Sequence, residues 1–206
     1  MFQDERIMNR FSVVQFILVT WFANLISIAA PLNAQIMNEP ANLKLGGWIL
    51  KPLNELFAAS IHGSPNVDIA VPNGSYTLQL LLYEGWRSRS ADIVIEGKTV
   101  SAAYDMFKEQ GRNFDHGSVL YHTFTLADGN IDIEINGPLH LGGLILSKGK
   151  ADSPDRVVVV THEASLDLKE VIKAINFGDT NDLNIGDVAF AAAAANTAVD
   201  LSLIHI

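Results

Sequence analysis

Residues 67–149 alternate apolar and polar side chains over short segments that end at turn-forming residues. The clearest case is residues 131–136, where Ile alternates with Asp, Glu and Asn. A period of two places successive side chains on opposite faces of a β-strand. Many short strands at this spacing, without helices between them, predict an all-β chain built as an antiparallel β-sandwich.

Turn sequences mark where the expected strands reverse. Pro72-Asn73-Gly74 and Asp128-Gly129 supply residues that tolerate positive φ, which tight turns require. Only two short helices are expected, around residues 53–59 and 166–175. The expected strands are residues 67–71, 75–83, 91–96, 99–102, 119–126, 131–136 and 141–146.

The composition excludes several kinds of site and partner. The chain has no cysteine, which excludes a disulfide framework, thiolate chemistry and Cys-ligated zinc or iron–sulfur sites. Its formal net charge is −9, and Arg87 with Arg89 is its one small basic cluster. We therefore expect no nucleic-acid partner and no binding to anionic membrane surfaces. The same acidic balance makes a monomer the expected state.

The N-terminal segment has the plan of a secretory signal peptide. A mostly apolar run over residues 11–30 follows a polar start and precedes small residues, among them Ala34. We expect a signal peptide over residues 1–34, with Met8 as the true start. An uncleaved membrane anchor is the alternative, since the run is long enough to span a bilayer. In both cases the rest of the chain would be secreted, periplasmic or on the cell surface, with no membrane contact beyond this leader.

The C-terminal third has a weaker pattern. Residues 148–156 are polar and contain Gly and Pro, which predicts a linker over residues 151–170. The last six residues, 201–206, read LSLIHI and resemble the translation of a sequencing adapter. We exclude them from fold reasoning.

Four segments carry a family resemblance. In order they read VPNGSYTLQLLLYEGW, ADIVIEGKTV, FTLADGNIDIEI and LGGLILSKG, and roughly residues 65–149 resemble malectin-like domains. The resemblance implies a galactose-binding-like jelly roll over residues 40–150 that binds carbohydrate at loops on one edge. The sequence AINFG at residues 174–178 resembles the opening of that family. It implies the truncated start of a second β domain over residues 171–200.

The resemblance also suggests binding residues. Trp86 and Arg87 fall where the family has paired aromatics, and Arg87 departs from the pattern. Asn136 or His140 would replace an acidic residue before the last strand. Sugar recognition needs an apolar plate and a few fixed hydrogen-bonding groups, which this set offers. The alternative is that Trp86 caps the end of the sandwich, Arg87 is a surface charge and His140 a satisfied loop histidine.

Two further aromatics, Trp48 and Tyr104, are expected to be exposed on neighbouring loops. No catalytic motif is present, and the histidines show no helical pair spacing, so we predict no enzyme activity, no metal site and no cofactor. Asp132 and Glu134 lie ~7 Å apart by strand geometry, a spacing seen in glycosidase acid pairs. Alternation on a solvated strand face explains them fully and is the favoured interpretation.

These observations favour a non-catalytic carbohydrate-binding module of a larger exported protein. Two alternatives stay open. One is a structural or adhesion β-sandwich without a small-sugar site, whose edge loops pack on one another. The other is an accessory domain of an enzyme whose catalytic part lies outside this chain.

Overall fold

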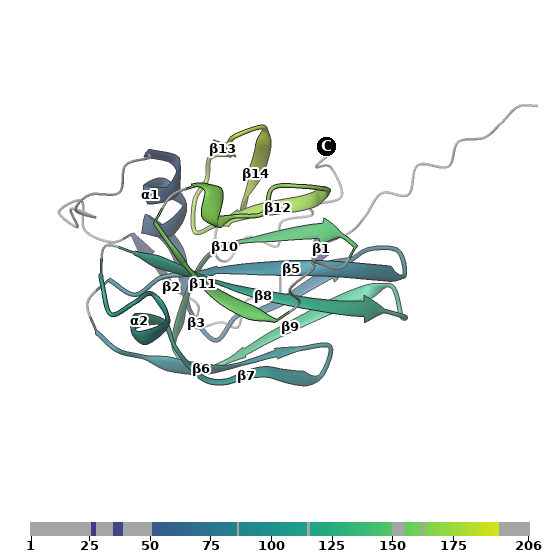
Figure 1. Ribbon diagram of the computed structural model, residues 1–206, viewed down its shortest axis with the longest axis horizontal. Coiled ribbons are helices and arrows are strands. Elements are labelled where there is room, and N and C mark those ends of the chain that lie inside the picture. Colours follow the sequence, from purple (N-terminus) through teal and green to yellow (C-terminus); the bar gives the residue numbers. More distant parts are fainter. Residues whose placement is uncertain are drawn as a thin grey trace, which may run out of the picture.

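The computed structural model is a two-sheet sandwich with a partial third layer (Figure 1). The sequence-based expectations for residues 1–34 and 201–206 fall outside the described part, except for one two-residue strand. Within the described residues, no helix is long and apolar enough to cross a membrane. The structure describes residues 51–85, 87–114, 116–149, 155–161 and 163–193, and the backbone of residues 26–27 and 35–38.

The first sheet has five strands. Their order is β1 (Ile26–Ser27), β4 (Asn66–Ala70), β9 (Asn130–Asn136), β6 (Ser90–Ile95) and β7 (Lys98–Asp105).

The second sheet is larger. The strands along it are β11 (Arg156–Val160), β8 (Gly117–Leu126), β5 (Gly74–Leu82), β10 (Leu139–Lys148), β12 (Val171–Phe177), β14 (Val188–Ala193) and β13 (Leu183–Ile185). One branch leaves β10 through β3 (Ala59–Gly63) to β2 (Gln35–Asn38). Among the described pairs only β12 and β14 run parallel.

The expected jelly roll is confirmed by the strand order. Strands β3 to β10 form the rows β3-β10-β5-β8 in one sheet and β4-β9-β6-β7 in the other. This order, in which the chain crosses repeatedly between two facing antiparallel sheets, is that of a jelly roll.

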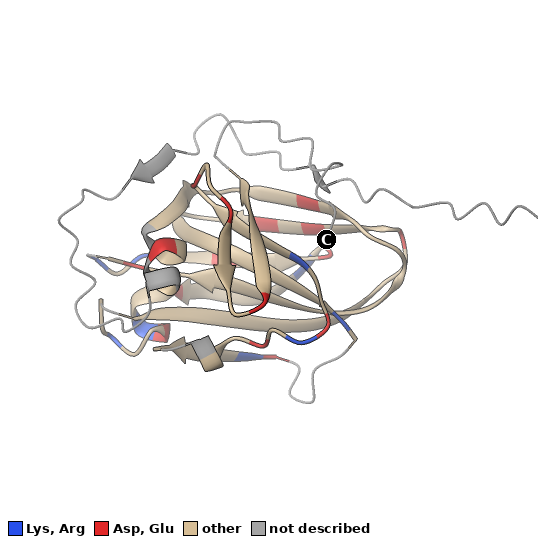
Figure 2. Cartoon of the chain, turned by 90° about the horizontal axis from the view of Figure 1, so that it is seen from above, with Lys and Arg blue, Asp and Glu red and all other residues tan. Residues whose placement is uncertain are grey.

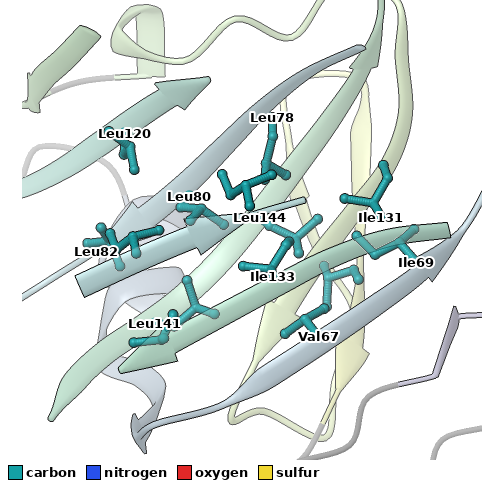
Figure 3. Packing of buried hydrophobic residues seen from close by; sticks show 14 of the residues in the cluster. Val67, Ile69, Leu78, Leu80, Leu82, Leu120, Ile131, Ile133, Leu141 and Leu144 are labelled. Atoms are coloured by element: carbon teal, nitrogen blue, oxygen red, sulfur yellow. The ribbon is translucent and has the colours of Figure 1, made fainter. Parts of the chain in front are cut away.

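The main core lies between the two sheets, as the alternation predicted. Ile131, Ile133 and Ile135 of β9 point inward, and each is at most 1% exposed. They face Leu78 and Leu80 of β5, with further contacts from β4 and β10 (Figure 3). Burying one such side chain contributes roughly 1.5–3 kcal/mol, so this layer is the main source of stability.

A second apolar cluster covers the outer face of the larger sheet. Side chains from helix α1 (Lys51–Ala58) and from strands β11 to β14 form this cluster with side chains of β5, β8 and β10. Strands β5 and β10 are thus buried on both faces. This explains why their sequences are nearly continuous apolar runs, while β9, with one solvated face, alternates.

The C-terminal segments differ from the expectation of a linker and a second domain. Part of the expected linker is β11, which pairs with β8, and the helix expected around residues 166–175 is replaced by β12 from Val171 onward. Strand β12 pairs with β10 and so extends the same sheet. The physical reason is that Ile175 and Phe177 enter the main core while Ala174 faces the second cluster, so both faces of β12 are buried by the first sandwich.

This arrangement predicts a steric effect at Gly143. An added Cβ would lie 2.6 Å from the Ile175 carbonyl oxygen of β12. Because the obstacle is backbone, we expect Gly143→Ala to lower the free energy of unfolding by about 1–3 kcal/mol in urea titrations. The matched control is Gly74→Ala, where the nearest atom is 3.7 Å away, and we expect a change within about 0.5 kcal/mol. Equal effects of the two substitutions would mean that β12 does not pack against β10.

Candidate functional site

One end of the sandwich gathers most of the predicted binding residues. At this end β10 pairs with both β5 and β3, through Leu141 opposite Leu82 and Leu139 opposite Gly63. Residues 83–89 leave β5 here and lead into β6, and a short turn joins β9 to β10. Strand pairing therefore brings Arg87, Asn136 and His140 to the same end. Trp86 belongs to this loop by sequence, but it lies outside the described residues, as does Trp48.

A buried ion pair fixes the loop that leads from β5 to β6. Glu84 is fully buried, and its Oε2 lies 2.8 Å from Nε of Arg89, which is also buried. Arg89 Nη2 donates to Glu84 Oε1 at 3.2 Å, and the backbone N–H of Arg87 donates to the same oxygen at 3.2 Å. The carboxylate of residue 84 thus links this residue to residues 87 and 89. Charged hydrogen bonds of this kind are stronger than neutral ones.

Gln110 holds the same loop from the other side. It caps the short helix α2 (Met106–Glu109) and is fully buried. Its Nε2 donates to the carbonyl oxygens of Glu84 and Asn113, both at 2.8 Å, and its Oε1 accepts from the Glu84 N–H at 3.1 Å. Both backbone polar groups of Glu84 are therefore satisfied by a single amide side chain.

The outer part of the loop is tied to the start of α2. Ser88 Oγ donates to Asp105 Oδ2 at 2.6 Å, while Asp105 Oδ1 accepts from the Lys108 N–H as the helix N-cap. The loop is thus anchored to both ends of α2, whereas the side chain of Arg87 remains exposed. The result is a loop that is held at Glu84, Arg87 and Ser88 and presents an exposed guanidinium.

His140 lies within β10 and is 1% exposed, so it is not an exposed loop residue. Its Nδ1 lies 3.2 Å from Ser60 Oγ of β3. Burial, followed by the positive charge of Arg89, lowers the pKa of His140 to about 3. The imidazole is therefore neutral at pH 7, and a direct contact with a bound sugar would require the surrounding side chains to move.

Tyr104 is 3% exposed and lies in β7, which corrects the expectation of an exposed loop aromatic. Its hydroxyl donates to Ser118 Oγ at 2.9 Å, and Ser118 Oγ donates to the Leu82 carbonyl at 3.4 Å. Burial raises the pKa of Tyr104 far above its ordinary value. The ring therefore closes the end of the sandwich between the two sheets, since its hydroxyl has a partner there.

The remaining predicted polar residues lie on the outer face of the first sheet. Asn136, at the end of β9, is exposed and opposite Asp92 of β6. Asp132 and Glu134 are also exposed on β9, and Asp132 is opposite Asp68 of β4. Asp and Glu are distributed over strands and turns of the described chain (Figure 2). Solvated alternation therefore accounts for Asp132 and Glu134.

Sequence reasoning missed the residues that position the loop. Glu84 and Arg89 were visible as charges at a strand end, but their burial was not. Gln110 carries no sequence signal, because its role depends on α2 lying beside the end of β5. Within the described residues, no group of three or more His, Asp or Glu is arranged to hold a metal ion.

Comparisons with known proteins identify no family. No family model and no curated protein matches the sequence. Among solved structures, a Bacteroides uniformis β-glucuronidase aligns with 22% identity and a TM-score of 0.40, over 46% of this chain and 12% of that one. The chain therefore spans only a small part of that enzyme's length.

Family 35 carbohydrate-binding modules also align. The module from Paenibacillus barcinonensis has 10% identity and a TM-score of 0.36, over 60% of this chain and 93% of that one. The module from Clostridium thermocellum has 16% identity and a TM-score of 0.33, over 60% of this chain and 98% of that one. At these TM-scores the overlap is partial, and the function proposed below rests on the residues of this chain.

Removing the arginine of the buried ion pair should be costly. We expect Arg89→Met to lower the free energy of unfolding by about 3–5 kcal/mol, because it removes the opposite charge that compensates the buried Glu84 carboxylate. Urea titration measures this. The control is Lys108→Met, which breaks an exposed pair with Glu109 and should cost less than about 1 kcal/mol. A loss as small as in the control would show that the loop does not depend on the Glu84–Arg89 pair.

The pKa of His140 predicts an acid-sensitive stability. The unfolded histidine has a pKa of 6.5 and the folded one about 3, so between these values the unfolded state binds more protons. The contribution of neutral His140 to the free energy of unfolding is therefore fully present above pH 6.5, and it is lost as the pH is lowered toward 3. We expect His140→Gln to remove up to about 1.4 kcal/mol per pH unit of this slope. Urea titrations across this range test it, and identical slopes for both proteins would contradict it.

Proposed function

We propose that this chain acts as a non-catalytic carbohydrate-binding module, with its site on the loop between β5 and β6. Trp86 supplies the apolar plate, Arg87 donates to sugar hydroxyls, and Asn136 contributes from the neighbouring strand end. The observation that carries this proposal is the fixing of the loop on both sides of Trp86 by buried Glu84.

Preorganisation is the physical link from that loop to binding. Sugars offer weak individual contacts, so a site that is ordered before the ligand arrives avoids the entropy cost of ordering it afterwards. Here the backbone at Glu84 and Arg87 and the side chain of Ser88 are already held by hydrogen bonds. Arg87 remains exposed and offers several donors in a planar group. A tryptophan beside it can stack on the C–H face of a sugar ring.

The burial of two other predicted residues reduces the number of side chains that can contact a sugar directly. His140 and Tyr104 are enclosed and act as supports beneath the loops rather than as direct contacts. Trp48 remains a prediction. The malectin-like assignment and an extracellular location behind the apolar leader are also part of this proposal, and both rest on sequence features.

A structural or adhesion spacer is the second candidate. The observation that favours it is the same burial, since His140 and Tyr104 were expected to contact ligand and instead pack the end of the sandwich. A spacer would keep the fixed loop, because the loop also closes the fold, but it would bind no small sugar.

Tryptophan fluorescence separates the two candidates. We expect a saturable change when the full chain is titrated with gluco- and galacto-oligosaccharides. Trp86→Ala should weaken binding by at least about tenfold, or about 1.4 kcal/mol, because the stacking plate is lost. Arg87→Ala should weaken it less, since a rim hydrogen bond contributes less than the plate.

The control is Lys98→Ala, which removes an exposed side chain at the turn between β6 and β7, outside the proposed site, and should leave the affinity unchanged. A protein that unfolds cooperatively but gives no saturable change with any sugar of the series would favour the spacer.

A further inference from the structure

Two histidines meet across strands β3 and β10. His62 and His140 are directly opposite each other in the antiparallel register, and their ring centroids lie 4.6 Å apart. Directly opposed side chains of an antiparallel pair are within contact distance. The two residues are 78 positions apart in the chain, so they belong to no local sequence motif. The pairing of the two strands brings them together.

Both imidazoles keep one nitrogen unused. Nε2 of His62 and Nε2 of His140 are buried, and neither has a hydrogen-bond partner among the described residues. Buried polar atoms without partners are rare, because each loses its bond to water on folding. An enclosed ion or water is one recognised explanation for such atoms.

The other nitrogen of His140 is already oriented. Its Nδ1 lies 3.2 Å from Ser60 Oγ, which can accept the Nδ1–H. In that tautomer Nε2 carries a lone pair directed away from Ser60. Histidines that bind metals commonly use one nitrogen for the ion and donate the other N–H to a neighbouring acceptor.

The charges near the two rings bear on any cation bound there. Burial and the positive charge of Arg89 disfavour positive charge at both imidazoles and lower the pKa of each. The positive charge of Arg89 opposes a cation, but the carboxylate of Glu84 lies 2.8 Å from its Nε and offsets that charge. Arg87 is the other charge that acts on both rings.

We propose that His62 and His140 together bind one divalent transition-metal ion, of the Zn²⁺ or Ni²⁺ type, at this end of the larger sheet. Ring centroids 4.6 Å apart place the two imidazoles in contact, and the proposal requires each Nε2 to lie about 2.0–2.1 Å from the ion. Imidazole suits these metals, whereas Ca²⁺ and Mg²⁺ take oxygen ligands.

Water or an external anion completes the coordination, because the described residues offer no third His, Asp or Glu in a metal-binding arrangement. The expected affinity is therefore lower than that of a site with three or four protein ligands. The proposal departs from the sequence-based expectation of no metal site, and it does not depend on the carbohydrate proposal.

Calorimetry of the full, untagged chain tests the proposal, with Zn²⁺, Ni²⁺ and Ca²⁺ as probes. We expect one equivalent of Zn²⁺ or Ni²⁺ to bind and Ca²⁺ not to bind. His62→Gln and His140→Gln should each weaken Zn²⁺ binding at least tenfold. The matched control is His122→Gln. His122 lies on β8 and its Nδ1 is 2.8 Å from Oδ1 of Asp155, so this substitution should leave Zn²⁺ binding unchanged.

Long-range ¹H–¹⁵N spectra of the imidazoles supply a second readout on the unmodified chain. Zn²⁺ should move the Nε2 signals of His62 and His140 and leave those of His122 in place. This keeps the test decisive even if His140→Gln fails to fold. No Zn²⁺ binding, binding that survives His62→Gln, or Nε2 signals that do not respond would each overturn the proposal and leave a buried water as the occupant.

Discussion

Glu84 carries a carboxylate with 0% of its side chain exposed, so its charge must be compensated inside the protein. Arg89 supplies the opposite charge, the Arg87 N–H supplies a further hydrogen bond, and Gln110 satisfies the backbone of Glu84 itself. These partners come from the loop after β5 and from the end of α2. The carboxylate of Glu84 therefore fixes how β5 passes into β6, and the backbone of the same residue ties α2 to that end of the sandwich.

The second organising element is β10, which is buried on both faces and pairs along both edges. It lies beside β5 on one side and beside β3 and β12 on the other. Gly142 and Gly143 make this possible, since a Cβ at either position would meet backbone oxygen within 2.7 Å. The close approach of Leu56 and Ile175 to these glycines joins the outer layer to the main sandwich, and the same strand carries His140 to the functional end.

Period-two alternation was enough to predict an antiparallel β-sandwich from sequence, and the jelly-roll form of it followed from the family resemblance. Residues 131–136 showed which side chains enter the core, and the turn sequences separated the strands correctly. Sequence could not show which sheet a later strand would join, because AINFG reads equally well as an opening strand or as an added one. The structure adds it to β10, where both of its faces are buried.

The site was harder to predict for a related reason. Arg87 and Asn136 are exposed, as either a contact residue or a surface residue would be, whereas Tyr104 and His140 are buried. No sequence rule says which face of a sheet end stays open. The partners of Glu84 depend on contacts between distant segments, as does the meeting of His62 with His140. A site that is assembled by contacts between distant segments can be predicted only in part from the sequence.

Amide chemical-shift mapping of the ¹⁵N-labelled full chain during sugar titration tests the central claim most directly, because it locates binding without assuming a contact residue. The account predicts saturable shifts concentrated in residues 83–89 and at Asn136, with the amides of β11 and of the β13–β14 pair unaffected. Saturable shifts centred elsewhere, or none in a folded protein across gluco- and galacto-oligosaccharides, would contradict the claim that the loop fixed by Glu84 is a carbohydrate site.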